Sequence, residues 1–256
     1  MEGGNINKRN TLFIILAGIF ITNAILAEMV GIKLFSLEKT IGIEGLSIQL
    51  FGSTPLGLNF TAGVLLWPFV FITTDIVNEY FGKKGVHRIS FLAAALISYA
   101  FIMLFFVTKL SPSDYWLSLY SKGPNGEVFD INYAFSMIFT QGMSIIVASL
   151  VAFLVGQIID VYVFTSIRKY TGDKYLWLRA TGSTLVSQLI DSFIVLFLAF
   201  YLFKDEEHRW SLPLLFSVGV LNYLYKFIVA IALTPVLYIA HYAIDKYLEI
   251  IPHKNS

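Results

Sequence analysis

Cysteine is absent from this chain of 256 residues, and charged residues are scarce. Without cysteine the protein can form neither disulfides nor thiolate metal sites, and it has no cysteine nucleophile. Asp, Glu, Lys and Arg make up 14% of the residues, against roughly 25% in soluble domains, while 57% are hydrophobic. This composition excludes an ordinary soluble protein and indicates an integral membrane protein in contact with the lipid bilayer.

Metal and nucleic-acid binding also find no support in the composition. The four histidines, His87, His208, His241 and His253, are scattered without the spacing of a zinc-binding motif. The net charge of +1 provides no field that would attract nucleic acid. We therefore expect no metal site, no cofactor and no nucleic-acid partner.

Six apolar runs are long enough to cross the roughly 30 Å of hydrocarbon in a bilayer. The run at 11–30 is too long for the apolar part of a signal peptide and has no clear cleavage site, so we interpret it as a retained span. The sequence predicts an all-α bundle of six transmembrane helices that forms one domain over residues 1–256. The six runs lie near residues 11–30, 60–78, 89–108, 134–162, 180–203 and 213–240.

Basic residues indicate how the bundle is oriented. With a cytoplasmic N-terminus, 11 of the 18 Lys and Arg residues would lie on the inner side and 6 on the outer side, while Lys226 lies within the sixth run. An even number of spans places both termini on the same side. The positive-inside rule therefore favours cytoplasmic N- and C-termini.

Two long connections lie on the predicted outer side. Residues 46–50 alternate apolar and polar side chains between glycines, which indicates a short strand or β-hairpin in the first extracellular loop, 32–59. Residues 110–133 contain two prolines and an Asn-Gly turn signal, and predict a loop with a short interfacial helix around 115–119.

Polar side chains inside the apolar runs are the strongest functional signal, since an Asp or Lys at the centre of a membrane helix costs about 2.5 to 3.5 kcal/mol. The segment VGQIID carries Gln157 and Asp160, and VSQLID carries Gln188 and Asp191. A spacing of three places both members of each pair on one helix face, and the two faces can meet at a similar depth. Such residues also serve as structural links between membrane helices, worth about 0.6 kcal/mol, and this alternative stays open.

Lys226 lies about 20 Å along its helix from the outer end, too deep for its ammonium to reach water. The sequence predicts an ion pair with Asp191 or Asp160. The second run ends with Asp75 and Glu79 one turn apart on one face, and Glu79 is close enough to the cytoplasmic surface to be solvated.

Three further residues shape the second and sixth runs. Gly82 is expected to end the helix that carries Asp75. Pro68 and Pro235 lie within apolar runs and predict kinks, because proline lacks the N–H that an interior helical turn requires.

Four segments in order resemble the queuosine precursor transporter family, also called vitamin uptake transporters. They are TTDIVNEYFGKK, VGQIIDVYVFTSIRKY, RATGSTLVSQLIDSF and YKFIVAIALTP. The resemblance covers the chain from the first run to the sixth. It implies a multi-pass protein of the bacterial inner membrane that imports 7-deazaguanine bases, the cyano and aminomethyl precursors of the tRNA nucleoside queuosine, and that is not an enzyme.

This resemblance turns the polar residues into candidate substrate contacts. A guanine-like edge presents adjacent N–H donors that a carboxylate accepts and a carbonyl oxygen to which an amide or ammonium donates, while aromatic rings stack on the base. Glu28 in the first run matches the family only loosely. The predicted substrate-binding residues are Trp67, Phe69, Asp75, Asn78, Glu79, Gln157, Asp160, Gln188, Asp191, Tyr223 and Lys226.

Two other classes remain open. Asp160 and Asp191 could form the dyad of an intramembrane aspartyl protease, although GQIID and SQLID lack the Gly-x-Gly-Asp signature of that class. The substrate-binding subunit of an energy-coupling-factor importer also has six spans, but the first run, ILAGIFITNAILA, lacks its small-residue contact. The preferred base, proton coupling against facilitated diffusion, and the oligomeric state, a homodimer included, stay open as well.

Overall fold

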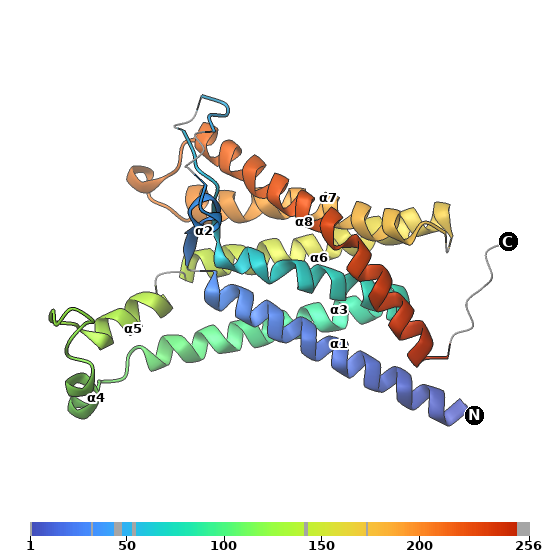
Figure 1. Cartoon of the computed structure of the whole chain (residues 1–256), viewed down its shortest axis with the longest axis horizontal. Helices are drawn as coiled ribbons and strands as arrows, with labels where there is room; N and C mark the ends of the chain where they lie inside the picture. The colour runs from blue at the N-terminus through green and yellow to red at the C-terminus, as the bar shows by residue number, and fades with distance from the viewer. Residues whose placement is uncertain are drawn as a thin grey trace.

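The computed structural model describes residues 2–31, 33–43, 48–52, 55–140, 143–172 and 174–249. Five helices in these residues are long and apolar enough to cross a membrane. They lie side by side in one bundle, and the start of the first helix and the end of the last lie at the same end of it, which holds the termini of the described chain (Figure 1). The prediction of an all-α membrane protein is confirmed. The five helices are α1 (Glu2–Val30), α3 (Trp67–Val107), α6 (Met143–Thr171), α7 (Leu176–Phe197) and α8 (Leu212–Tyr247).

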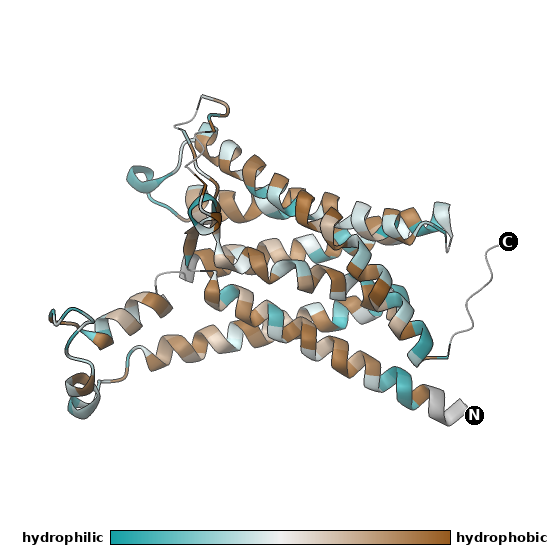
Figure 2. Ribbon diagram, viewed as in Figure 1, coloured by the Kyte–Doolittle hydropathy of each residue, from teal (hydrophilic) through white to brown (hydrophobic). Residues whose placement is uncertain are grey.

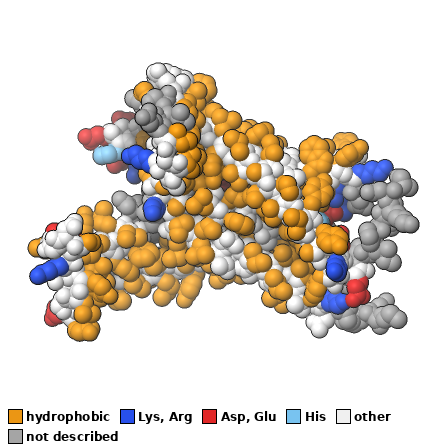
Figure 3. Space-filling view, in the orientation of Figure 1, with side chains coloured by type: hydrophobic (Ala, Val, Ile, Leu, Met, Phe, Trp, Pro, Cys, Tyr) orange, Lys and Arg blue, Asp and Glu red, His pale blue; other side chains and the backbone are white. Residues whose placement is uncertain are grey.

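Hydrophobic side chains cover the length of the bundle. Figure 2 shows brown, hydrophobic residues along the long helices and teal, hydrophilic residues mainly at their ends and in the loops. On the face seen in Figure 3, the Lys, Arg, Asp and Glu side chains gather towards the two ends, with an apolar band between them. This distribution is the one that a bilayer requires of a surface in contact with lipid.

Helix α3 contains a reversal of the chain. Its 41 residues would span roughly 60 Å as a straight helix, about twice the hydrocarbon thickness. Gly82 interrupts the helix with φ 64° and ψ −173°, a conformation that is essentially open only to glycine. The first arm (67–81) runs towards the end that holds the termini and the second arm (83–107) runs back (Figure 1). The helix end predicted at Gly82 is confirmed.

A small sheet closes the first long loop at the opposite end of the bundle. Strand β1 (Leu34–Ser36) pairs antiparallel with β2 (Asn59–Thr61). Helix α2 (Leu37–Ile41) follows β1, and the 3₁₀ turn η1 (Ala62–Leu65) follows β2. A short strand or hairpin was predicted at 46–50 in this loop, and Ile48 does form an isolated antiparallel bridge with Leu56. The named strands lie at the base of the loop, and residues 46 and 47 lie outside the described residues.

The second long loop contains the short helix expected there, since α4 covers Asp114–Leu119. The apolar run predicted as one span at 134–162 is divided between α5 (Ile131–Thr140) and α6, with residues 141 and 142 outside the described residues. After α7, a π-helical turn η2 (Leu198–Leu202) and a 3₁₀ turn η3 (Glu206–His208) lead to α8.

The kink predicted at Pro68 is wrong. Pro68 lies in the first turn of α3, where its missing N–H breaks no helical hydrogen bond, so it starts the helix rather than bending it. Pro235 does lie inside α8. At the end that holds the termini, Lys8 of α1 forms a 2.5 Å ion pair with Glu249, and this hydrogen bond lowers the pKa of the exposed Glu249 carboxyl.

Candidate functional site

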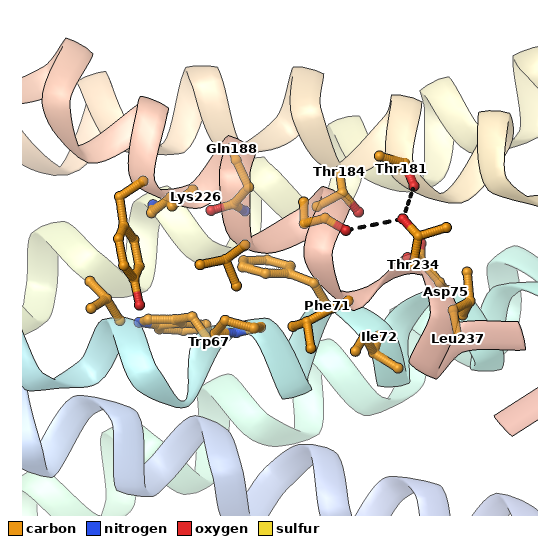
Figure 4. A pocket seen from close by; sticks show the side chains of 16 residues that line it. Trp67, Phe71, Ile72, Asp75, Thr181, Thr184, Gln188, Lys226, Thr234 and Leu237 are labelled. Atoms are coloured by element: carbon orange, nitrogen blue, oxygen red, sulfur yellow. Dashed lines mark hydrogen bonds between the residues drawn. The ribbon is translucent and has the colours of Figure 1, made fainter. Parts of the chain in front are cut away.

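A cleft opens between the first arm of α3, α7 and α8 (Figure 4). The space within it that admits the centre of a water molecule is about 40 Å³, so the cleft is narrow as it stands. The walls are mainly apolar, with a small number of polar groups. The polar lining residues are Asp75, Thr181, Thr184, Gln188, Lys226 and Thr234, and the aromatic ones are Trp67, Phe71 and Tyr225.

Aromatic rings form one wall of the cleft. Trp67 and Phe71 are one turn apart on α3, and their rings stack with centroids 5.9 Å apart and planes 23° apart. In Figure 4 they face Gln188 and Lys226 across the cleft. Tyr225 adds a third ring, which packs on Phe60 of β2 at 4.7 Å. A flat ring system entering the cleft therefore meets aromatic faces from two helices.

The two other aromatic residues predicted from the sequence do not line the cleft. Phe69 is 49% exposed on α3. Tyr223 packs edge-on against Phe227. Their neighbours Phe71 and Tyr225, two positions further on, lie in the cleft instead.

Lys226 is held in place by an ion pair across the cleft wall. Its ammonium lies 2.6 Å from Oδ2 of Asp191 on α7, and the two side chains are only 16% and 18% exposed. The ion pair predicted for Lys226 is confirmed, with Asp191 as the partner. Because Lys226 lines the cleft and Asp191 neutralises it, the pair offers N–H donors to a ligand without adding net charge.

Three buried oxygen atoms of the cleft lining have no hydrogen-bond partner within the described part of the chain. They belong to the side chains of Asp75 (Oδ1), Thr184 (Oγ1) and Gln188 (Oε1). Since buried polar groups are nearly always paired in proteins, such a cluster requires an explanation. Carboxylate and amide oxygens are hydrogen-bond acceptors, so this wall suits a ligand that is rich in N–H donors.

Other predicted residues lie behind the cleft, buried between α3, α6 and α7. Gln157 exchanges hydrogen bonds of 3.3 and 3.4 Å with Thr74 of α3 and accepts one of 3.3 Å from Ser90. Asp160 accepts a 3.3 Å hydrogen bond from Ser187 of α7. Asn78 is 1% exposed.

The two QxxD segments pack against each other, as the sequence predicts. A Cβ built on Gly156 would lie 3.7 Å from the Cβ of Asp191, an ordinary van der Waals contact, so α6 and α7 pack against each other at this point. Asp191 is nonetheless paired with Lys226, and Asp160 with Ser187. The two aspartates therefore do not form the facing dyad that an aspartyl protease needs.

Glu79 lies outside the cleft lining, at the end of the bundle that holds the termini. The guanidinium of Arg179 binds both its carboxylate oxygens at 2.8 and 3.1 Å, and Arg168 lies 3.6 Å away. Arg179 also donates to the carbonyls of Gly172 (3.2 Å) and Lys174 (3.1 Å), and is 2% exposed. Arg179 thus clamps the α6–α7 connection to α3.

Glu28 is buried near the opposite end of the bundle and does not line the cleft. It accepts a short hydrogen bond from Ser149 of α6 and lies near enough to Asp191 for the two carboxyls to interact. Its placement indicates a link between α1 and α6.

The hydroxyl groups of α7 line the cleft but were not predicted from the sequence. Thr181 and Thr184 line the cleft at seven and four residues before Gln188, which is the spacing of one helix face. Thr181 contacts Thr234 of α8 at 3.1 Å. The signal was available in the segment RATGSTLVSQLIDSF, because hydroxyl groups recur there through an apolar helix.

Residues 61–240 match the family model described as "Putative vitamin uptake transporter". A "Probable queuosine precursor transporter" of Bacillus subtilis (strain 168) is 31% identical over 186 residues, which cover 72% of each chain. The "Queuosine precursor transporter" of Escherichia coli (strain K12) is 30% identical over 182 residues, 69% of this chain and 70% of its own. A further "Probable queuosine precursor transporter", from Haemophilus influenzae, is 28% identical over 179 residues, 68% of this chain and 64% of its own. No solved structure matches the chain at a significant level.

Proposed function

The chain belongs to the vitamin uptake transporter family, and from this premise we propose that it imports queuosine precursors, 7-cyano- and 7-aminomethyl-7-deazaguanine, across the cytoplasmic membrane. It is a multi-pass membrane transporter and not an enzyme. The observation that carries the choice of substrate is the wall of unpartnered acceptors at Asp75 and Gln188, opposite the stacked rings of Trp67 and Phe71.

The chemistry of a 7-deazaguanine matches this wall. The ring N–H and the exocyclic amino group are adjacent donors, and one carboxylate can accept both in a paired geometry. In the proposed arrangement Asp75 and Gln188 accept from this edge, and Lys226 donates to the ring oxygen or to the substituent at position 7. The rings of Trp67, Phe71 and Tyr225 then stack on the base.

The other predicted residues support these contacts from behind. Gln157 and Asp160 tie α6 to α3 and α7, and Glu79 ties α3 to α7 through Arg179. Asp191 holds Lys226 at the cleft. We assign no substrate contact to Phe69 or Tyr223, because neither lines the cleft.

Counting the two arms of α3 separately, the proposed topology has six transmembrane helices and both termini in the cytoplasm. The end that carries β1 and β2 then faces outward. Ser217 at the start of α8 donates a 2.8 Å hydrogen bond to the carbonyl of Leu50, so the outer loop is fastened beside the helix that carries Lys226. Substrate would enter beneath this loop, and the Glu79–Arg179 clamp would close the inner side until release.

Rescue of tRNA modification tests the proposal. Cells that can neither make the precursor nor import it would express this protein and receive each base at low concentration. The account predicts queuosine in tRNA well above the level given by an empty vector. A membrane-inserted protein that gives no more queuosine than the vector, with either base, would refute the assignment.

A further inference from the structure

Two buried carboxyl groups lie at and behind the wall of the cleft without a basic partner. Asp75 on α3 and Asp160 on α6 are 6% and 2% exposed, and the hydrogen bonds between Thr74 and Gln157 join their two helices at this level. Neither forms an ion pair with another described residue. The nearby basic groups are already occupied, because Lys226 binds Asp191 and Arg179 binds Glu79.

Hydroxyl groups from one turn and a half of α7 surround this pair. Ser187 donates to Asp160 at 3.3 Å. Ser183 and Thr184 lie within about one turn of Ser187 on the same helix, and Thr184 lines the cleft together with Asp75. The Thr184 oxygen nevertheless completes no hydrogen bond of standard geometry within the described chain, and one oxygen of each carboxyl is likewise unpartnered.

An amide provides an independent indication of a ligand at this place. Asn78 is 1% exposed, and neither atom of its amide has a partner among the described residues. The first arm of α3 and α6 run in the same direction (Figure 1), and Thr74 is bonded to Gln157. Asn78 lies four residues beyond Thr74, and Asp160 three beyond Gln157, so the amide lies at the level of the carboxyl.

Two neighbouring carboxylates in a low-dielectric interior cannot both remain ionised without a compensating positive charge. We propose that this cluster binds one monovalent cation, a proton or Na⁺, and that Asp75 connects this cation to the ligand in the cleft. Carboxylate, hydroxyl and amide oxygens are the ligands of hard cations. No group of three or more His, Cys, Asp or Glu side chains in the described ranges could hold a multivalent metal. The proposed ligands are Asp75, Asn78, Asp160, Ser183, Thr184 and Ser187.

The site has two faces. Asp75 lines the cleft, whereas Asp160 lies behind it and does not reach the ligand. A cation on the pair therefore sets the charge that Asp75 shows to the substrate, and substrate binding in turn changes cation affinity, since such coupling is reciprocal. The cation site stands on the geometry alone, while its role in uptake rests on the proposed function.

Other titratable groups face the cluster from the end that holds the termini. Glu79 of α3 is neutralised by Arg179 of α7 and lies near Arg168 of α6. His241 of α8 is bonded to the hydroxyl of Tyr80 through Nδ1 at 2.9 Å. Glu79 has partners of its own, whereas His241 has one at Nδ1 and none at Nε2 within the described chain. Variants of Asp160 leave both groups in place and so test the cluster separately.

The site itself is tested on the purified full-length protein in lipid nanodiscs, without substrate. Two readouts are used: the apparent melting temperature with Na⁺ replaced by choline, and the infrared band of a protonated carboxyl followed as pH is changed. We expect Na⁺ to raise the melting temperature, or the carboxyl band to titrate, and Asp160→Asn to abolish whichever signal is present. Ser98→Ala is the matched control, because its hydroxyl bonds only its own helix, and it should keep the wild-type signal.

A second variant protects this test against loss of folding. Ser187→Ala removes one hydroxyl and keeps both carboxyls, so it should weaken Na⁺ binding or move the pH midpoint of the band. The proposal would be overturned if the wild-type protein gave neither signal. It would also be overturned if the signal were unchanged in both Asp160→Asn and Ser187→Ala.

Coupling is tested in proteoliposomes supplied with labelled 7-cyano-7-deazaguanine. One imposed gradient, either acid outside or Na⁺ outside, should drive wild-type protein to accumulate the base above equilibrium, whereas Asp160→Asn should exchange the base without accumulating it. The coupling would be overturned if wild type and Asp160→Asn accumulated the base equally. It would also be overturned if neither gradient drove the wild-type protein to accumulate the base. Absence of all uptake by wild type would instead refute the proposed function, and would leave the result from nanodiscs to decide the cation site.

Discussion

At the scale of single residues, unpaired acceptors dominate the chemistry of the cleft. Each buried polar atom without a partner costs about 1–3 kcal/mol, and hydrocarbon supplies no water to reduce that cost. Asp75, Thr184 and Gln188 carry this cost together in one wall. A ligand whose N–H groups meet these oxygens recovers part of it, so binding and stability are linked at these residues.

Asp75→Asn replaces an acceptor-only carboxylate by an amide of the same shape. Loss of a hydrogen bond to a charged group costs about 1.5–3 kcal/mol, which corresponds to roughly 10- to 150-fold weaker apparent affinity. Concentration-dependent uptake measures the change. Asp205→Asn is the control, because Asp205 is exposed and caps its short helix with no side-chain hydrogen bond. Equal affinity in Asp75→Asn and wild type would remove Asp75 from the substrate site.

Lys226 and Asp191 should behave as a coupled pair. Lys226→Met leaves the Asp191 carboxylate without its partner. Since the pair is mostly buried, we expect the free energy of unfolding to fall by roughly 3 kcal/mol. The double variant Lys226→Met with Asp191→Asn should recover the apparent melting temperature but not uptake, because the donor to the ligand is still missing. A double variant with wild-type uptake would reduce the pair to a structural link.

The sequence was sufficient to predict several of these residues, and the reason differs from one to the next. Lys226 had to have an anionic partner, because a lysine that deep cannot reach water. The spacing of Gln188 and Asp191 fixed their common face, but spacing alone does not fix how a helix is rotated against its neighbours. For that reason Phe69 was predicted in place of Phe71.

At the scale of elements, Gly82 makes two arms of opposite direction from one helix (Figure 1). Its φ of 64° with ψ −173° is closed to residues with a Cβ, and no side chain or backbone of another element lies within 4 Å of the position where a Cβ would be. The strain of a substitution there is therefore purely one of backbone conformation.

Gly82→Ala should lower the free energy of unfolding by about 1–3 kcal/mol. The apparent melting temperature of the purified protein checks this. Gly18→Ala is the matched control, because Gly18 lies within helix α1 with nothing within 4 Å of an added Cβ, and alanine favours a helix. If both variants melt at the wild-type temperature, the reversal at Gly82 does not depend on glycine.

Element boundaries were predictable where the sequence carries a local signal for the end of a helix or for a turn. Gly82 ended a helix as expected, and α4 formed where expected. The run at 134–162 was predicted as one element because hydropathy stays high along it, and hydropathy measures the tendency to leave water rather than the continuity of a helix. The register of β1 and β2 could not be predicted from the sequence either, since it depends on pairing between residues that are far apart in the chain.

At the scale of the whole molecule, topology follows from whether α3 crosses the membrane once or twice. Two crossings give six spans and place both termini in the cytoplasm. A single crossing gives five spans and places the C-terminus outside. The ion pair between Lys8 and Glu249 joins the two terminal segments and supports the first arrangement.

The absence of cysteine makes this topology directly testable, since any introduced cysteine is unique in the chain. With a membrane-impermeant maleimide on intact cells, we expect Glu207→Cys to be labelled. Lys83→Cys and Lys246→Cys, both at exposed positions, should be labelled only after permeabilisation. Labelling of Lys246→Cys in intact cells would contradict six spans.

The central claim, that this cleft carries a 7-deazaguanine base across the membrane, is tested most directly by uptake into proteoliposomes of purified protein. The account predicts saturable entry of labelled 7-cyano-7-deazaguanine, competition by the aminomethyl base, and a strong loss of apparent affinity in Asp75→Asn. Entry no faster than into protein-free vesicles, from protein that is folded and inserted, would contradict it.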